Sequence, residues 1–463
     1  MSVEGRIYIP VVDAENCNTC AVCMGGCPAE VIPEQRKEES SLRGRIYKDV
    51  KTPPSIGIET PRMPPCQEAC PIHQDIRGYI RLIAERGYKE ALELIRETNA
   101  LPSVTGYVCH HPCEVECIRD SVDEPASTRA LERFVTDFDD GELSPTKVEK
   151  GKGKKVSIIG SGPSGLTAAH DLAKDGYQVE IIEAFLEPGG MLRWAIPHFR
   201  LPRHILHRDI NYIEKMGVII KTGIRFGIDI TLSDVKKRGT DAVIMAIGTH
   251  QDLELSVEND AIEGCIDCLD FLRKYANGDK LTLGDKVMVI GGGNAALDAA
   301  RCVMRCGAKE VEIVYRRSRQ EMPAGRDEIK EAEAEGVRLT YLAMPVRIIE
   351  RDGEVQGLEC KRTELGEPDE SGRRRPVPIE GSEFVVTATS IISAIGQQPD
   401  LSWNQGGLQF NFSPRNSFIT DENGLTNIDG VFAAGDAVNG PTTVVEAMAS
   451  GRRVAKAVAL YLS

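Results

Sequence analysis

Six short, mostly apolar runs mark the chain after residue 150, and β-branched side chains are frequent in them. They span residues 156–159, 177–182, 241–248, 286–290, 310–315 and 390–394. Uninterrupted apolar runs of this length are typical of strands buried on both faces, as in a parallel sheet covered by helices. The pattern therefore predicts an α/β protein built on parallel sheets.

The segment before residue 150 has a different pattern. Residues 76–86 and 88–98 carry apolar side chains three and four positions apart, which predicts two amphipathic helices, and a third helix is expected to begin near Ser127. Residues 33–65 are charged and then rich in proline, so we interpret them as a linker. Further along, the polar segment 361–378 is expected to form an inserted hairpin or loop.

The run at 156–159 leads into the motif Gly160-x-Gly162-x-x-Gly165, which opens a helical stretch. The first glycine permits a tight turn, the second lets the backbone approach a pyrophosphate, and the third lets the helix pack closely on the strand. Glu183 ends the next strand, where an acid can accept hydrogen bonds from a ribose. Strand, glycines, helix and acid together predict a dinucleotide-binding fold. The alternative is a glycine-rich loop without a ligand.

A second motif of this kind follows the run at 286–290. It reads Gly291-Gly-Gly293-Asn294-Ala295-Ala296, with alanine as its last small residue. After the following strand stand Arg316 and Arg317, where an acid would bind a free ribose. Arginines at this place suit a 2′-phosphate, so NADPH is the predicted second nucleotide, and a solvated basic turn is the alternative.

Loops rich in glycine and proline follow the first motif at 188–192 and 196–202, as expected where backbone lies near a flat ring. The chain closes with the stretch 430–436 and a helix from about Thr442. Asp436 can bond the ribityl hydroxyls of a flavin, and the helix N-terminus offers a positive dipole to the reduced ring. We expect FAD to be bound by the following residues: Gly160, Gly162, Pro163, Ser164, Gly165, Glu183, Gly190, Met191, Leu192, Arg200, Gly248, Gly435, Asp436, Thr442 and Thr443.

Nine of the 14 cysteines lie at or before Cys117, and none falls between there and Cys265. Four of them have the spacing C-x2-C-x2-C-x3-C-P, which bacterial ferredoxins use for a [4Fe–4S] cluster: Cys17, Cys20, Cys23 and Cys27. Zinc is the alternative, although zinc sites usually separate two C-x2-C pairs by a longer loop. The remaining early cysteines are further candidate cluster ligands: Cys66, Cys70, Cys109, Cys113 and Cys117.

Composition narrows the class of protein further. Lys and Arg number 56 and Asp and Glu number 70, so the net charge is −14, which argues against nucleic acid as a partner. No apolar run approaches the length of a membrane span, and the N-terminus has no signal-peptide core. Many cysteines without a secretory signal indicate a reducing compartment, so we predict a cytoplasmic protein.

Six segments carry a family resemblance: residues 66–71, 108–117, 160–165, 196–202, 315–324 and 435–436. Through them the chain resembles the small subunit of bacterial glutamate synthase, the flavin/iron–sulfur subunit of NADH-dependent ferredoxin:NADP oxidoreductase and the N-terminal part of dihydropyrimidine dehydrogenase. The resemblance implies two nested dinucleotide-binding domains, for FAD and NADPH, after a helical iron–sulfur domain. The expected domains are a ferredoxin-like segment at 1–50, a helical [4Fe–4S] domain at 51–145, an FAD-binding domain at 150–280 and 389–463, and an NAD(P)H-binding domain at 281–388.

The resemblance also implies cluster ligands. In that family one cluster takes the ligands that correspond here to Cys70, Cys109, Cys113 and Glu132. The other cluster takes Cys66, Cys117 and two cysteines whose positions hold Ile58 and Pro61 here, so it cannot form in the family's way. The run at 17–27 is the candidate replacement. We therefore expect two [4Fe–4S] clusters and leave a third open.

These features predict a flavin-linked oxidoreductase subunit. NADPH or NADH would give a hydride to FAD, and electrons would pass through the clusters to a partner redox subunit or a ferredoxin. No side chain is obliged to act as an acid or a base. One alternative is a thioredoxin reductase-like flavoprotein whose dithiol is Cys265 and Cys268. The other is a non-catalytic electron-relay or assembly subunit.

Overall fold

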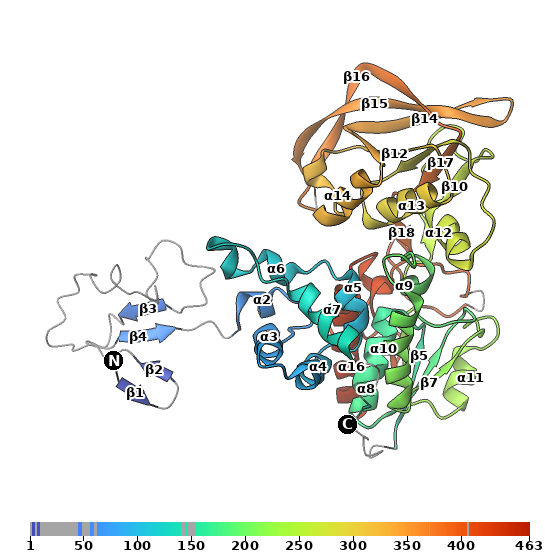
Figure 1. The fold of residues 1–463 in the computed structure, drawn as a ribbon. Helices are drawn as coiled ribbons and strands as arrows, with labels where there is room; N and C mark the ends of the chain where they lie inside the picture. The colour runs from blue at the N-terminus through green and yellow to red at the C-terminus, as the bar shows by residue number, and fades with distance from the viewer. Residues whose placement is uncertain are drawn as a thin grey trace. The chain divides into compact units, whose positions relative to one another are not determined.

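The structure is a computed structural model that describes residues 63–139, 144–145, 153–369, 371–404 and 407–463, together with the backbone of four short strands nearer the N-terminus. The predicted cluster run at 17–27 and Pro61 lie outside the described residues. The chain divides into two compact units. Figure 1 labels most of the helices and strands. The smaller unit comprises Met1–Thr98 and His111–Leu131, and the larger unit comprises Asn99–His110 and Glu132–Ser463.

The smaller unit begins with two antiparallel strand pairs. β1 (Ser2–Glu4) pairs with β2 (Ile7–Ile9), and β3 (Arg45–Lys48) pairs with β4 (Ile56–Glu59). The prediction of a linker over residues 33–65 is therefore wrong for these last two segments. Their isoleucines and tyrosine favour extended backbone, which the charged and proline-rich surroundings obscured.

Short helices form the rest of the smaller unit. They are α2 (Pro65–Glu68), α3 (Ile76–Ala84), α4 (Tyr88–Arg96), α6 (Pro112–Val115), the 3-10 helix η1 (Ile118–Ser121) and the start of α7 (Thr128–Phe138). α3 begins where the side chain of Asp75 accepts a hydrogen bond from the backbone N–H of Gly78, 3.0 Å away. α3 packs against α4 through the apolar faces that the spacing predicts.

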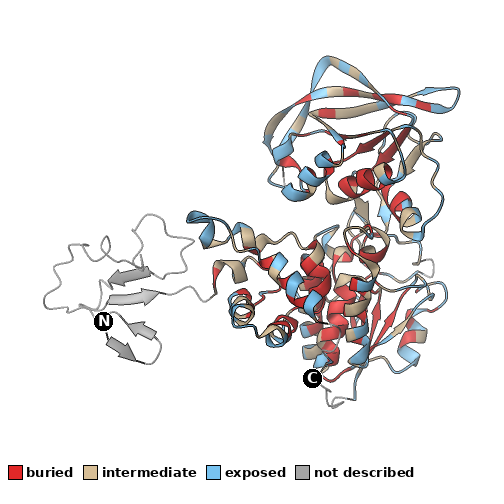
Figure 2. Ribbon diagram, viewed as in Figure 1, coloured by how far each residue is buried: buried red, intermediate tan, exposed pale blue. Residues whose placement is uncertain are grey.

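The larger unit contains a first parallel sheet in the order β19-β8-β5-β6-β7. Its strands are β5 (Lys155–Ile159), β6 (Gln178–Ile182), β7 (Ile219–Lys221), β8 (Ala242–Met245) and β19 (Val431–Ala433). α8 (Pro163–Lys174) follows β5 and packs along α16 (Val444–Tyr461). Figure 2 shows the strands and the inner faces of these helices buried.

A second parallel sheet has the order β10-β17-β11-β12-β13. Its strands are β10 (Cys265–Asp267), β11 (Lys286–Ile290), β12 (Glu310–Tyr315), β13 (Arg338–Tyr341) and β17 (Ser390–Ser393). The helices α12 (Cys268–Asn277), α13 (Asn294–Arg305) and α14 (Arg326–Ala334) accompany it. Since β10 and β17 pair within this sheet, the sheet extends across the predicted boundaries at 280 and 388.

A three-stranded antiparallel sheet is inserted between β13 and β17 (Figure 1). It consists of β14 (Ala343–Arg351), β15 (Glu354–Pro368) and β16 (Arg374–Thr387). The hairpin expected at 361–378 is thus present as the outer half of the long β15–β16 hairpin.

The remaining elements of the larger unit are short except for α10, which has 13 residues. They are α5 (Pro102–Val108), α9 (Met191–Trp194), α10 (Arg203–Lys215), α11 (Leu232–Lys237), β9 (Gln251–Asp252), η2 (Arg319–Glu321), β18 (Gln397–Gln398) and α15 (Asp436–Asn439). α5 packs on α10, where the backbone N–H of Val104 donates to Oδ2 of Asp209 over 3.0 Å. Among the described helices, none combines the length and the apolar character that crossing a membrane requires.

Candidate functional site

One large cavity of the larger unit is lined by residues from both parallel sheets. Its volume is about 2230 Å³, well above the roughly 300–1,000 Å³ of a typical single-ligand pocket. Loops after β5, β6 and β8 line it from the first sheet, and loops after β11, β12 and β17 line it from the second. Ligands of open parallel sheets bind outside the carboxyl ends of the strands, and this cavity lies there for two sheets at once.

The first glycine motif has the geometry that its spacing predicts. Gly160 turns the chain out of β5 with φ of +106°, and a Cβ atom there would overlap the carbonyl oxygen of Ala246. A Cβ atom on Gly165 would overlap the carbonyl oxygen of Gly160, so α8 packs against the end of β5 only because this residue is glycine. A Cβ atom on Gly162 would meet nothing within 4 Å. The middle glycine thus leaves the backbone open toward the cavity.

Two polar side chains near this turn line the cavity, and they differ in whether the protein supplies them with hydrogen-bond partners. The hydroxyl of Ser164, in the first turn of α8, is buried and has no hydrogen-bond partner among the described residues. Glu183 is 4% exposed, and its Oε2 accepts from the backbone N–H and the hydroxyl of Ser161 over 2.9 and 2.5 Å. Its Oε1 accepts from the backbone N–H of Phe185 over 2.9 Å. The carboxylate is held in place by its own chain, and its remaining lone pairs can accept further bonds.

The second motif forms the corresponding turn between β11 and α13. Gly293 is the N-cap of α13, and Asn294 is the first residue of the helix. The Asn294 side chain is fixed, since Nδ2 contacts Nε2 of His110 at 2.5 Å and Oδ1 accepts from the backbone N–H of Gly325 over 3.3 Å. The N-terminus of α13 opens into the same cavity as that of α8.

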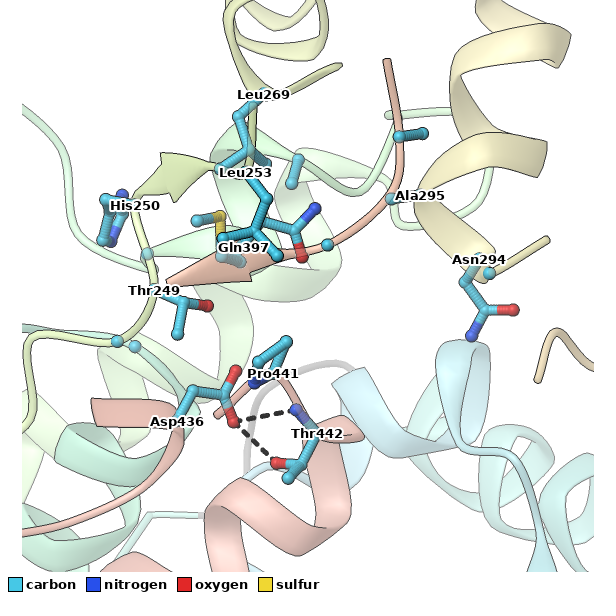
Figure 3. Close-up of a pocket in the computed structure, with 18 of the residues that line it drawn as sticks. Thr249, His250, Leu253, Leu269, Asn294, Ala295, Gln397, Asp436, Pro441 and Thr442 are labelled. Carbon is cyan, nitrogen blue, oxygen red and sulfur yellow. Dashed lines mark hydrogen bonds between the residues drawn. The ribbon is translucent and has the colours of Figure 1, made fainter. Parts of the chain in front are cut away.

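Asp436 begins α15 and faces the cavity opposite the β9 strand region, as Figure 3 shows. Its Oδ1 accepts from the backbone N–H and the hydroxyl of Thr442 over 3.1 and 2.6 Å. Burial raises the pKa of Asp436 to about 6, although the bonds from Thr442 act in the opposite direction. Nearby, burial and then the charge of Arg273 lower the pKa of His250 to about 4. The imidazole of His250 is therefore neutral near pH 7.

Arg200 joins the segment after the first motif to the helix of the second. Its Nη1 donates to both carboxylate oxygens of Asp298 on α13 over 2.8 and 2.7 Å, and its Nη2 pairs with Glu328. Burial raises the pKa of Asp298 to about 6 even beside this cation. Arg200 lines the cavity, and its ion pairs connect the part of the wall that follows the first motif to α13 and α14.

Most of the residues predicted to bind FAD or NADPH line this one cavity. Those that do are Gly160, Gly162, Pro163, Ser164, Glu183, Gly190, Met191, Leu192, Arg200, Gly248, Asp436, Thr442, Thr443, Gly291, Gly293, Asn294, Ala295, Arg316 and Arg317. Three do not line it. Gly165 and Ala296 lie under their turns, and a Cβ atom on Gly435 would lie 2.7 Å from Cβ of Ser164, so these residues permit close packing.

Sequence reasoning missed several cavity residues. Phe185, His250 and Trp403 come from loops with no motif of their own, and no sequence signal singles them out. Arg373 and Arg375 also line the cavity, from the start of β16. Their signal was the basic run at 373–375, which lies inside the segment interpreted only as a hairpin or loop.

The dithiol alternative is not favoured by the position of its cysteines. Neither Cys265 nor Cys268 lines the cavity. Cys268 is 0% exposed, and burial raises its pKa well above the usual value. Burial also raises the pKa of Cys265 to about 11. Because thiol exchange requires a thiolate and access, these side chains are suited to packing rather than to redox exchange.

The candidate cluster cysteines of the smaller unit lie in and around two packed helices, α2 and α6. Cys66 lies in α2, and burial, followed by the charge of Cys117, raises its pKa. Cys70 and Cys113 are buried, and Sγ of Cys113 lies 3.1 Å from Oγ1 of Thr128. The described residues include no group of three or more His, Cys, Asp or Glu side chains around a single metal ion. A four-iron cluster, which takes its ligands at separate irons, remains a prediction.

Glu132 and Cys109 belong to the larger unit. Glu132 is 6% exposed, and its Oε1 accepts from Nδ2 of Asn99 over 2.8 Å and from the hydroxyl of Thr105 over 2.6 Å. A buried carboxylate is costly unless its charge is compensated, so this residue is not the solvated helix residue that composition alone would suggest.

Two family models match the chain. Residues 154–451 match the pyridine nucleotide-disulphide oxidoreductase model, and residues 60–142 match the model of domain II of dihydropyrimidine dehydrogenase, a 4Fe-4S cluster domain. The fold class predicted from the sequence, two dinucleotide-binding domains after an iron–sulfur domain, is confirmed.

Individual proteins give the same result. The chain is 43% identical to the beta subunit of an NADP(+)-dependent formate dehydrogenase of Moorella thermoacetica, over 86% of this chain but only 60% of that subunit. It is 34% identical to the small chain of the NADPH glutamate synthase of Escherichia coli, over 86% of this chain and 89% of that one. In fold it is similar to FprA of Mycobacterium tuberculosis, solved in complex with NADPH, with a TM-score of 0.58 and 20% identity over 67% of this chain and 84% of FprA.

Proposed function

Because this chain belongs to the pyridine nucleotide-disulphide oxidoreductase family, together with the glutamate synthase small chains, we propose that it passes electrons from NADPH through FAD to iron–sulfur clusters. The electrons would leave for a partner redox subunit or a ferredoxin. The relatives named above are beta subunits or small chains, which supports a role within a larger assembly.

One observation carries this proposal: both glycine motifs open into one cavity of the larger unit. Hydride transfer requires the nicotinamide and the flavin ring to meet face to face, and two separate pockets would prevent this. A shared cavity whose volume exceeds that of a single-ligand site satisfies the requirement.

The residues around the first motif fit FAD. The open side of Gly162 and the unpartnered hydroxyl of Ser164 would receive the pyrophosphate at the N-terminus of α8. Glu183 would accept the ribose hydroxyls, and Asp436 the ribityl hydroxyls. Bound FAD would supply hydride acceptance and the release of electrons one at a time. The protein's part is to orient the ring, place the dipole of α16 near it and exclude water, and no acid or base is required of a side chain.

The residues around the second motif fit NADPH. The N-terminus of α13, which begins at Asn294, would hold the pyrophosphate, and Arg316 and Arg317 would favour a 2′-phosphate. The neutral imidazole of His250 adds no charge to the cavity wall at pH 7. Because Arg316 and Arg317 would favour the 2′-phosphate, the proposed donor is NADPH rather than NADH.

The iron–sulfur part of the proposal rests on the family match over residues 60–142 and on the cysteines. One [4Fe–4S] cluster would take Cys70, Cys109, Cys113 and Glu132. The burial of Glu132 and the two donors that fix its Oε1 support a ligand role for this carboxylate. A second cluster would draw on Cys66, Cys117 and the run at 17–27.

Cofactor content tests this proposal. The full chain, prepared anaerobically, should hold one FAD and about eight irons, the content of two cubes. It should also reduce an artificial dye from NADPH without any partner, which a non-catalytic assembly subunit would not do. Folded protein without flavin, or with zinc in place of iron, would contradict the proposal.

A further inference from the structure

The end of the cavity beyond β12 is strongly basic. Arg316 and Arg317 reach it from the loop after β12, and Arg373 and Arg375 reach it from the β15–β16 hairpin. Among the residues that the structure describes, Asp369 on the same hairpin is the acidic residue that lines this end. Among the described residues, cationic side chains therefore outnumber carboxylates at this end, and they come from two segments 56 to 59 positions apart in the sequence.

Arg317 is already engaged by the protein itself. It is 4% exposed, its Nη2 pairs with Asp369, and its Nε donates to the carbonyl oxygen of Arg374 over 2.8 Å. Arg374 in turn donates through Nε to Oε1 of Glu321 over 2.6 Å. These bonds fasten the start of β16 to the loop after β12.

A further contact fixes the hairpin to the same loop. The hydroxyl of Thr363 on β15 donates to the carbonyl oxygen of Arg316 over 2.8 Å. Both strands of the hairpin are thus bonded to the segment 316–321. These bonds between the hairpin and the loop after β12 determine where Arg373 lies relative to Arg316.

Arg316 and Arg373 differ from Arg317 in that no ion pair holds either guanidinium among the residues that the structure describes. Arg373 donates through Nε to the hydroxyl of Ser371 over 2.9 Å. Burial, followed by the charges of Arg317 and Arg373, lowers the pKa of Arg316. Two neighbouring guanidinium groups that form no ion pair repel each other, and a bound anion would stabilise them. A guanidinium can donate two parallel hydrogen bonds to the oxygens of one phosphate.

We propose that Arg316 and Arg373 form a two-sided clamp for the 2′-phosphate of NADPH, and that Arg317 is a positioning residue that seats the hairpin. This inference rests on the proposed function, since it names the part of the same site that selects the nucleotide. The inserted sheet thereby determines which nucleotide binds. A 2′-phosphate carries a charge near −2 at pH 7, and two guanidinium groups from opposite sides would match it.

Binding of two nucleotide fragments to the FAD-loaded full chain tests the clamp without requiring electron transfer. Calorimetry would compare 2′,5′-ADP with 5′-AMP for the wild type, Arg316→Gln, Arg373→Gln and the matched control Arg351→Gln. Arg351 lies on the same inserted sheet with its side chain 81% exposed, outside the cavity. Arg316→Gln and Arg373→Gln should each weaken 2′,5′-ADP roughly 10- to 100-fold, the value of a charge-assisted bond, and leave 5′-AMP and the control unchanged.

A double-mutant cycle tests the positioning role of Arg317. The Arg317→Ala variant loses both of the bonds by which this residue holds the hairpin, so Arg373 should be misplaced in it. Adding Arg373→Gln to this variant should then weaken 2′,5′-ADP by less than threefold. A full additive loss would show that Arg317 acts independently of Arg373, as it would if it bound the phosphate directly. If Arg373→Gln behaves like the control, or weakens both fragments equally, the clamp is wrong. If 2′,5′-ADP binds as expected but NADPH reduces no flavin, the clamp stands and the proposed function fails.

Discussion

At the scale of single residues, three aspartates of the larger unit, one buried and two partly buried, hold protons more tightly than usual. Burial raises the pKa values of Asp252, Asp298 and Asp436 to about 6 in each case. Asp298 keeps this raised pKa beside Arg200 because desolvation outweighs the attraction of the cation. Each of these groups therefore binds a proton in the folded state at a pH where the unfolded chain has released it. The contribution of these three groups to folding stability therefore falls as the pH rises from about 4 to above 6.

Asp252→Asn isolates one such contribution. The asparagine keeps an acceptor for the backbone N–H of Leu269, which donates to Oδ2 over 2.9 Å, but it cannot ionise. Relative to the wild type, the variant should gain roughly 1–2 kcal/mol of stability between pH 4.5 and pH 7, because it escapes the cost of ionising a partly buried acid. Unfolding of both proteins in denaturant at several pH values measures this difference. A difference that does not change with pH would contradict the assigned pKa.

At the scale of elements, a close contact between two helices of the larger unit lies behind the first glycine motif. α16 packs along α8, and a Cβ atom on Gly451 of α16 would overlap the carbonyl oxygen of Ser164. This contact sets how near the N-terminus of α16 and the turn at Gly162 can approach each other. The capping box of α16, formed by Thr443 and Glu446, begins the helix at the cavity wall.

Gly451→Ala should therefore destabilise the protein despite the better helix propensity of alanine. Overpacking costs about 1–3 kcal/mol, and the propensity gain returns about 1 kcal/mol. The exposed Lys456→Ala on the same helix is the matched control and should change stability by less than about 0.5 kcal/mol. Thermal unfolding together with retention of FAD is the readout. Equal behaviour of the two variants would show that α8 and α16 can move apart freely.

The sequence predicts the elements of this unit well where a buried strand ends in glycine. The runs at 286–290 and 310–315 match β11 and β12 residue for residue. Gly291 ends the first run and Arg316 ends the second, so each apolar run has a clear boundary in the sequence. The contacts of Arg317 could not be predicted in this way. Its ion pair with Asp369 joins residues 52 positions apart, and only the seating of the hairpin decides it. The basic run at 373–375 marked Arg373 as a charged residue, but nothing near it in the sequence showed that it lines the cavity.

At the scale of the whole molecule, the chain spans about three-fifths of the length of the formate dehydrogenase beta subunit that it matches. Both glycine motifs lie beyond residue 150, as do all the residues that line the cavity except Val108 and His110, whereas the cysteine run at 17–27 lies in the first 50 residues. Flavin reduction and cluster assembly should therefore be separable along the chain.

A chain that starts at Lys51 tests this separation. It should keep FAD and NADPH-driven flavin reduction, lose the iron of at least one cluster and lose most electron transfer to an external acceptor. Losing cluster ligands should also lower stability, because metal binding contributes to folding. Iron analysis and dye reduction under anaerobic conditions provide the measurement. Full iron content and full transfer in the shortened chain would mean that the run at 17–27 has no part in the clusters.

We propose that hydride passes from NADPH to FAD inside one cavity and that the iron–sulfur clusters are reduced afterwards. Anaerobic stopped-flow mixing of the full chain with NADPH, or with NADPH deuterated at the transferred position of C4, tests this order of events. We predict that the flavin absorbance falls in a step that deuterium slows, and that the signal of reduced iron–sulfur clusters appears only after this step. Iron reduced before or without the flavin, or no loss of flavin absorbance on mixing, would contradict the account.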